Sequence, residues 1–154
     1  MALRSKAFGI REVLAEIPPS PLSSLDEINH LVTDSVIIDL PLPPSVNRLM
    51  ARLGNKSTVV QRWIRVADAH LMSRPAEWRR IQAGAVKGPF LIHITWDREE
   101  FGISDIDNRC KVLLDYLQRI CLIENDRLCR AMSVRFGVAP DGCRVRIRPW
   151  DWQS

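Results

Sequence analysis

Apolar residues recur along the chain with two different spacings, which predicts a domain of mixed helices and strands. Between residues 59 and 74 they return every three or four positions, as they do on a helix with one buried face. Pro75 opens a second short helix, and the same helical spacing runs from residue 107 to residue 119. Four segments are β-branched or alternate apolar with polar residues, and we expect them to be strands: residues 35–40, 89–96, 132–138 and 143–149.

The order of these elements predicts a small α/β (α+β) domain, residues 35–154, in which a mixed β-sheet packs with helices. The strand at 89–96 is the best candidate for the centre of the sheet. The turn sequence Ala-Pro-Asp-Gly at 139–142 separates the last two strands and predicts a C-terminal β-hairpin. Residues 1–34 hold two short helical segments around a stretch rich in Pro and Ser, and we interpret them as an N-terminal appendage.

Composition and charge narrow the class of protein. The chain has 154 residues, of which 46% are hydrophobic and 26% charged, as in an ordinary folded protein. Its net charge of +4 favours a polyanionic partner, nucleic acid before membrane. The four cysteines form no C-x-x-C pair and the three histidines are isolated, so a zinc site has little support and no histidine is assigned a role. Charges near the start disfavour a signal peptide, and no apolar run reaches the length of a membrane span. We expect a cytoplasmic protein with no membrane partner and with reduced, buried thiols.

Three aspartates are candidates for a metal site. Asp105 and Asp107 lie two residues apart where a loop meets a helix, so in an extended segment both carboxylates point to the same side. Asp126 follows after one helix and a short connection, which could return it to the same end. Two or three carboxylates plus a substrate phosphate suffice for Mg²⁺. The alternative is that Asp105 or Asp107 caps the helix, which needs only one of them and does not explain Asp126.

Lys111 has two interpretations. It lies one helical turn after Asp107 and one turn before Asp115, so it could belong to a ladder of salt bridges along the helix surface. It could instead direct its positive charge at a scissile phosphate and stabilise the charge that develops during cleavage.

Three segments of the chain resemble the RusA family of Holliday junction resolvases. They are LPLPPSVNR at 40–48, DIDNRCKVLLDYL at 105–117 and ENDRL at 124–128. The Asp-x-Asp-Asn-x-x-Lys block is fairly specific by itself, and the three blocks in this order and at these spacings are more so. The resemblance covers roughly residues 35–149 and implies a RusA-like fold, a homodimer and a four-way DNA junction as the substrate.

The same resemblance implies roles for the charged residues. Asp105, Asp107 and Asp126 match the metal-binding aspartates of the family, and Lys111 matches a lysine needed for cleavage. The implied cofactor is Mg²⁺, with Mn²⁺ as an alternative. The implied reaction is hydrolysis of a phosphodiester, in which the metal polarises the phosphate and activates water. Paired symmetric nicks would then resolve the junction during DNA recombination and repair, and a homodimer supplies one site for each nick.

Other positions match the family in part. Asn47 and Arg48 match loop residues near the active site, whereas Asn108 and Asp115 match positions whose role we take to be structural. The acidic pair of the family is Asn125-Asp126 here, so its first member carries no charge. Residues 1–34 have no counterpart. The alternative function is therefore a catalytically inactive, or differently specific, DNA-binding protein of the same fold that acts on branched or phage replication DNA.

Arginines on the last two strands are candidate DNA contacts. Three of them alternate with apolar residues on the final strand, and a fourth lies on the strand before it: Arg144, Arg146, Arg148 and Arg135. Such a stripe suits contacts with phosphates, which dominate the affinity for DNA. It is also typical of a solvated strand face in an antiparallel sheet.

Overall fold

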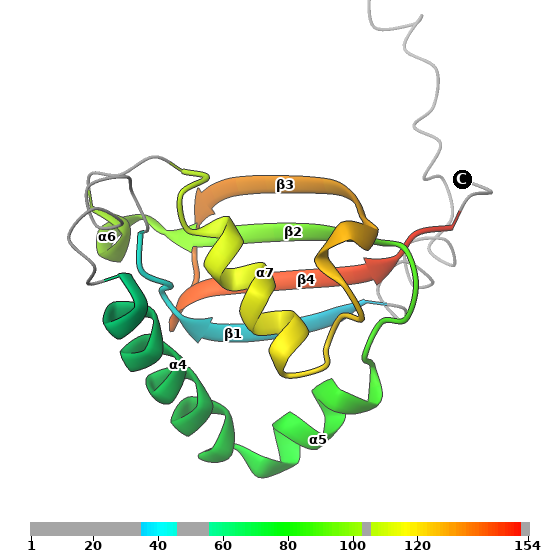
Figure 1. Ribbon diagram of the computed structural model, residues 1–154, viewed down its shortest axis with the longest axis horizontal. Helices are drawn as coiled ribbons and strands as arrows, with labels where there is room; N and C mark the ends of the chain where they lie inside the picture. The colour runs from blue at the N-terminus through cyan, green and yellow to red at the C-terminus, as the bar shows by residue number, and fades with distance from the viewer. Residues whose placement is uncertain (1–34, 46–55, 103–105, 152–154) are drawn as a thin grey trace, which may run out of the picture. The chain divides into compact units, whose positions relative to one another are not determined.

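A computed structural model describes residues 35–45, 56–102 and 106–151 of the chain (Figure 1). The predicted appendage at 1–34 lies outside the described residues, as do Asn47, Arg48 and Asp105. The described elements are, in order, β1 Val36–Pro41, α4 Lys56–Met72, α5 Pro75–Ala83, β2 Phe90–Asp97, α6 Arg98–Phe101, α7 Cys110–Arg119, the 3₁₀ helix η1 Asp126–Leu128, β3 Cys129–Gly137 and β4 Gly142–Pro149. These described residues form a small α+β domain, as the sequence predicted.

The four strands form one mixed sheet in the order β1-β4-β2-β3. Strand β4 pairs antiparallel with both β1 and β2, and β2 pairs parallel with β3. All four predicted strands are present, and β2 is an internal strand as expected. The connection from β2 to the parallel strand β3 passes through α7, which lies in front of the sheet in Figure 1.

The C-terminal hairpin differs from the prediction in its pairing. Strands β3 and β4 are consecutive, antiparallel and joined at the predicted turn, but β2 lies between them in the sheet. They therefore form a split hairpin rather than a directly paired one. The alternating pattern and the turn sequence predict that the chain reverses between two strands. They do not determine which strand pairs with each of these two in the sheet. The most apolar strand, β2, takes the position between β3 and β4, where backbone partners are available on both sides.

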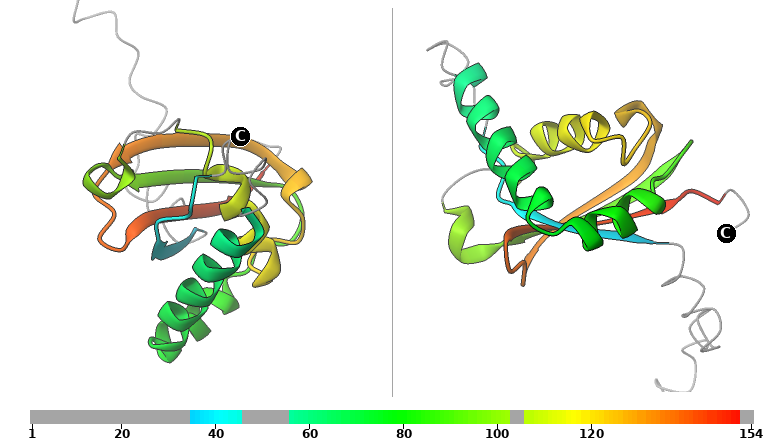
Figure 2. Two further views of the ribbon diagram at one scale, coloured as in Figure 1. Left: turned by 60° about the vertical axis from the view of Figure 1, so that its left-hand side comes forward. Right: turned by 90° about the horizontal axis from the view of Figure 1, so that it is seen from below.

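One face of the sheet carries the hydrophobic core. Helix α7 lies across this face, and α4 and α5 pack on the β1 side (Figures 1 and 2). Tyr116 of α7 contacts Trp63 of α4 edge to face, with 4.9 Å between ring centroids. Residues from the strands alternate into the core: Val36, Ile38, Leu40, Phe90, Ile92, Ile94, Trp96, Cys143, Val145 and Ile147.

Two boundaries differ from the predicted ones, and one helix was not predicted. Helix α4 begins at Lys56, three residues before the predicted helical spacing starts at residue 59. Helix α7 begins at Cys110 rather than Asp107, because residues 106–109 form a turn. The short helix α6 was not predicted; the Asp97 side chain caps it by accepting hydrogen bonds from the backbone N–H groups of Glu99 and Glu100.

Two further expectations concern membranes and thiols. Among the described residues, no helix is long and apolar enough to cross a bilayer. All four cysteines are free, but only Cys110 and Cys143 are buried; Cys129 is half-buried and Cys121 is exposed. The expectation of buried thiols is therefore correct for two of the four.

Candidate functional site

The start of α7 lies beside the segment that follows β1. The Arg109 guanidinium donates a hydrogen bond to the carbonyl of Pro43, and the Trp96 indole donates one to the carbonyl of Ile106 at 3.0 Å. These two contacts fix the 106–109 turn against the end of β2 and against residues 42–45. Two of the three segments that carry the family resemblance are therefore adjacent in the described structure. Asn47 and Arg48 belong to the first of these segments but lie outside the described residues.

Lys111 joins two carboxylates that come from different elements. Its ammonium lies 2.7 Å from Oδ1 of Asp115, one turn further along α7, and 2.6 Å from Oδ2 of Asp126 in η1. The Lys111 side chain is 65% exposed and that of Asp126 is 23% exposed. The structure contains a contact relevant to each interpretation of Lys111. The salt bridge to Asp115 lies along α7, and the salt bridge to Asp126 joins Lys111 to a residue that is distant in the sequence.

The end of α7 and the turn after it determine where Asp126 lies. The chain reverses at Cys121, a non-glycine residue with φ 59°. The backbone N–H of Asp126 donates to the Gln118 side chain at 3.2 Å, and Asn125 Oδ1 accepts from the N–H of Arg127 at 2.9 Å. Asn125 therefore caps η1. An aspartate at position 125 could accept the same bond, so the loss of charge relative to the family leaves the capping role intact.

The contacts of Lys111 shift the pKa values of the groups involved. Its hydrogen bonds to Asp115 and then to Asp126 raise the pKa of the lysine. The hydrogen bond from Lys111 lowers the pKa of the Asp126 carboxyl from its usual value of 3.8. Both groups are therefore charged at neutral pH. In the turn before α7, burial and then the charge of Asp107 raise the pKa of the Cys110 thiol to about 11, so this thiol stays protonated.

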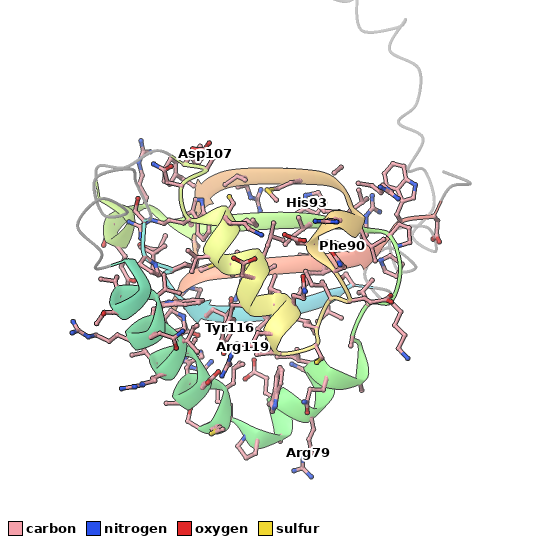
Figure 3. All side chains as sticks on the ribbon, in the orientation of Figure 1. Arg79, Phe90, His93, Asp107, Tyr116 and Arg119 are labelled. Atoms are coloured by element: carbon pink, nitrogen blue, oxygen red, sulfur yellow. The ribbon has the colours of Figure 1, made fainter. Side chains whose placement is uncertain are left out.

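Asp107 does not cap α7. The N-cap position is Arg109, and no side chain accepts a capping hydrogen bond there. The backbone carbonyl of Asp107 accepts from the N–H of Cys110 at 3.0 Å, and its side chain is exposed at the start of the helix, where it is labelled in Figure 3. The capping alternative is therefore wrong for Asp107. Asp105 lies outside the described residues.

The oxygen donors fit a hard cation by chemistry, but the described residues do not complete a site. Within them, no group of three or more His, Cys, Asp or Glu side chains could hold a metal ion. Of the three predicted ligands, Asp107 and Asp126 are described, and the Lys111 ammonium lies against Asp126. A cation that bound Asp126 would share that carboxylate with Lys111 or replace it.

The predicted DNA-binding arginines lie on the opposite face of the sheet from α7. Val145 and Ile147 of β4 are buried in the core under α7. Arg144, Arg146 and Arg148 alternate with them along the strand and therefore project from the other face. The structure therefore does not bring the arginines together with Lys111 and Asp126.

Two of these arginines already have partners within the sheet. The Arg144 guanidinium makes two hydrogen bonds to the Asp39 carboxylate on β1, at 2.7 and 2.9 Å. Nε of Arg135 donates to the Thr95 hydroxyl at 3.3 Å. The Asp39 pair gives Arg144 a structural role that the sequence did not indicate.

Two residues on that face were missed by the sequence analysis. His93 on β2 and Ser133 on β3 are paired in register, and Nδ1 of His93 lies 2.5 Å from the Ser133 hydroxyl. Both side chains are exposed. The only signal in the sequence was the alternation of the two strands, which becomes informative once the parallel pairing of β2 with β3 is known.

Comparison with known proteins adds no family assignment. No protein-family model matches the chain, and no curated protein matches it in sequence. The functional argument therefore rests on the residues and on their arrangement.

Proposed function

We propose that the chain is a Mg²⁺-dependent, structure-selective endodeoxyribonuclease that resolves Holliday junctions by paired symmetric nicks. The observation that carries the proposal is the contact between Lys111 and Asp126, which are 15 residues apart and belong to separate blocks of the resemblance. The contact between Arg109 and Pro43 adds support, because it joins the remaining block, residues 40–48, to the start of α7.

The roles follow from chemistry and position. Asp107 and Asp126, with Asp105, would hold one or two Mg²⁺ ions, which would polarise the scissile phosphate and activate water. The Lys111 ammonium would offset the negative charge that builds up on the phosphate during cleavage. The hydrogen bond that the backbone N–H of Asp126 donates to the Gln118 side chain would hold this carboxylate at the site.

The test compares three DNA substrates of matched sequence: a four-way junction, a flap and a linear duplex. Each is incubated with and without Mg²⁺, and nicks are mapped on every strand. We expect Mg²⁺-dependent nicks, paired across the junction, that Asp107→Asn abolishes. Glu77→Gln removes a carboxylate of α5 and should leave cleavage unchanged, so it controls for the loss of one negative charge.

Two outcomes would count against the proposal. Equal rates on the linear duplex would contradict the preference for junctions. Tight DNA binding without any Mg²⁺-dependent nicking would contradict the enzyme and favour the catalytically inactive DNA-binding protein. The uncharged Asn125, at the position where the family pattern has an acidic residue, is the observation that favours this alternative.

A further inference from the structure

The exposed face of the sheet carries a row of polar side chains across its centre. Register places Arg146 of β4, His93 of β2 and Ser133 of β3 opposite one another, and paired residues project on the same face. All three are exposed, and none of them has a role in the proposed cleavage site. Leu91 and Arg148 form the next row on one side, and Thr95 with Arg135 forms the row on the other.

The charge on this face is positive and largely unbalanced. Arg135, Arg146 and Arg148 have no ion pair within the described parts of the chain, whereas Arg144 is neutralised by Asp39. Rows on one face of a sheet are about 7 Å apart and strands are about 5 Å apart, so the three arginines surround His93 at a distance that long side chains can cover. A single anion above His93 could contact more than one guanidinium.

The His93–Ser133 pair offers a donor in either tautomer. If the Ser133 hydroxyl donates to Nδ1, the Nε2–H of the imidazole remains to donate to a ligand. If Nδ1–H donates to Ser133, the hydroxyl hydrogen remains instead. A small neutral donor among guanidinium groups suits a tetrahedral oxyanion, because such an anion accepts several hydrogen bonds from different directions.

We propose that His93 and Ser133, with Arg146, Arg135 and Arg148, form a phosphate-binding site on the face of the sheet opposite Lys111 and Asp126. The favoured source of the phosphate is a nucleic-acid backbone, because the arginines extend over three rows and could follow successive phosphates. That choice of source rests on the proposed function, whereas the phosphate site itself does not. The two faces would then contact different DNA segments, one cut and one only held.

Binding at this site should take up a proton. Burial and the charges of Arg148, Arg146 and Arg135 lower the pKa of His93, so its imidazole is neutral at pH 7. The charged and polar groups that face the His93 imidazole are these three arginines and Ser133. The described carboxylate on this face is that of Asp39, which is paired with Arg144 in the next row. A bound phosphate offsets the arginine charges and therefore raises the pKa of His93. Affinity should rise as the pH falls.

The experiment follows the His93 ring proton by NMR across pH, in the full chain and with EDTA present so that no cleavage occurs. The probes are a 12-nucleotide single strand, a duplex of the same sequence, tripolyphosphate and inorganic phosphate. His93→Gln identifies the resonance. We expect DNA to raise the pKa of His93 by about half a unit or more, which corresponds to a roughly threefold preference for the protonated form.

Arg146→Gln tests the geometry, and Arg80→Gln on α5 is the control for loss of one exposed positive charge. We expect Arg146→Gln to weaken DNA binding at least fivefold and to raise the pKa of His93 in the free protein, while Arg80→Gln does neither. Equal effects of the two variants would overturn the site, because DNA binding would then depend only on the overall positive charge of the protein. An unchanged His93 resonance with every probe would overturn it as well.

The remaining outcomes identify the source of the phosphate. A response to DNA and not to inorganic phosphate or tripolyphosphate would support a backbone site. A response to the small anions alone would overturn the choice of nucleic acid. Cleavage is scored separately with Mg²⁺, so a chain that fails to cut DNA but passes this titration would contradict the proposed function and not the phosphate site.

Discussion

At the scale of single residues, Lys111 determines how the candidate site behaves without a metal. Its ammonium contacts Asp115 and Asp126 together, so two carboxylates that would otherwise repel each other share one cation. The sequence indicated each of these pairs separately, the first from helical spacing and the second from the resemblance. It could not show that both form at once, because that depends on where the turn after α7 returns the chain.

Lys111→Met should raise the pKa of Asp126 towards the usual value of 3.8, because the hydrogen bond that lowers it is lost. A lowered carboxyl pKa adds stability above the unfolded value and loses it as pH falls through the folded value. The difference in free energy of unfolding between wild type and variant should therefore be present at pH 6 and shrink below about pH 4. Carbon-13 NMR of the carboxyl groups measures the pKa of Asp126, and urea titrations at several pH values measure the free energy of unfolding.

Lys87→Met is the matched control, since Lys87 is also an exposed lysine. It should leave the titration of Asp126 unchanged. An Asp126 pKa that stays the same in Lys111→Met would show that the contact does not persist in solution.

Asn125→Ala and Asn125→Asp separate capping from charge. The alanine variant loses the bond to the N–H of Arg127 and should cost roughly 1 kcal/mol of unfolding free energy. The aspartate variant keeps the bond, so its stability should match wild type within about 0.5 kcal/mol. It also restores the first acidic residue of the pair in the family pattern, so its Mn²⁺ affinity should rise. Calorimetric titration with Mn²⁺ checks this, and an unchanged affinity would place position 125 outside the metal site.

At the scale of elements, periodicity predicted which segments are helices or strands but not their neighbours. The buried face of α7 follows from its helical spacing. Strand β2 is internal and is buried at nearly every position, including Leu91 and Thr95, so alternation alone does not give its burial. The position of β2 between β3 and β4 does not follow from the pattern either, since a turn sequence specifies a reversal and leaves room for another strand. The contact between His93 and Ser133 was missed for the same reason: the two residues are 40 positions apart and meet only through this strand order.

The turn between β3 and β4 also supports the end of β1. Gly142 closes this turn with φ 111°, and a Cβ there would lie 2.7 Å from the backbone nitrogen of Leu42. Gly88 also has a positive φ, 79°, but a Cβ there would meet nothing within 4 Å. The two positions therefore differ in packing more than in backbone conformation.

Gly142→Ala should destabilise the protein more than Gly88→Ala does. Both variants pay for an unfavourable φ, on the order of 1–3 kcal/mol, and only the first adds a clash with backbone that cannot move aside. We expect the excess to be about 1–2 kcal/mol. Urea unfolding of the two variants measures the difference, and equal losses would show that the end of β1 shifts freely.

At the scale of the whole molecule, the sheet separates two chemistries. Asp107, Asp126 and Lys111 lie with α7 on the core side, and the arginines lie on the other side with His93. The sequence predicted metal binding by the aspartates and DNA contacts by the arginines and gave His93 no role, but it could not place these residues on different faces, because a list of motifs carries no information about faces. The strand register separates these residues into a candidate cleavage site on one face and a candidate phosphate-binding site on the other.

The whole-molecule prediction concerns assembly. A four-way junction has two-fold symmetry, and one chain supplies one set of Asp105, Asp107 and Asp126, so two matched nicks need two copies. We expect a homodimer of about 35 kDa, twice the 17.6 kDa of the chain, by light scattering on a size-exclusion column. Mixing wild type with an excess of Asp107→Asn should then give mixed dimers that nick one strand and leave junctions unresolved. If the mixture instead resolves junctions in proportion to its wild-type content, with no excess of single nicks, the two cuts are made by independent chains and the paired-site arrangement is wrong.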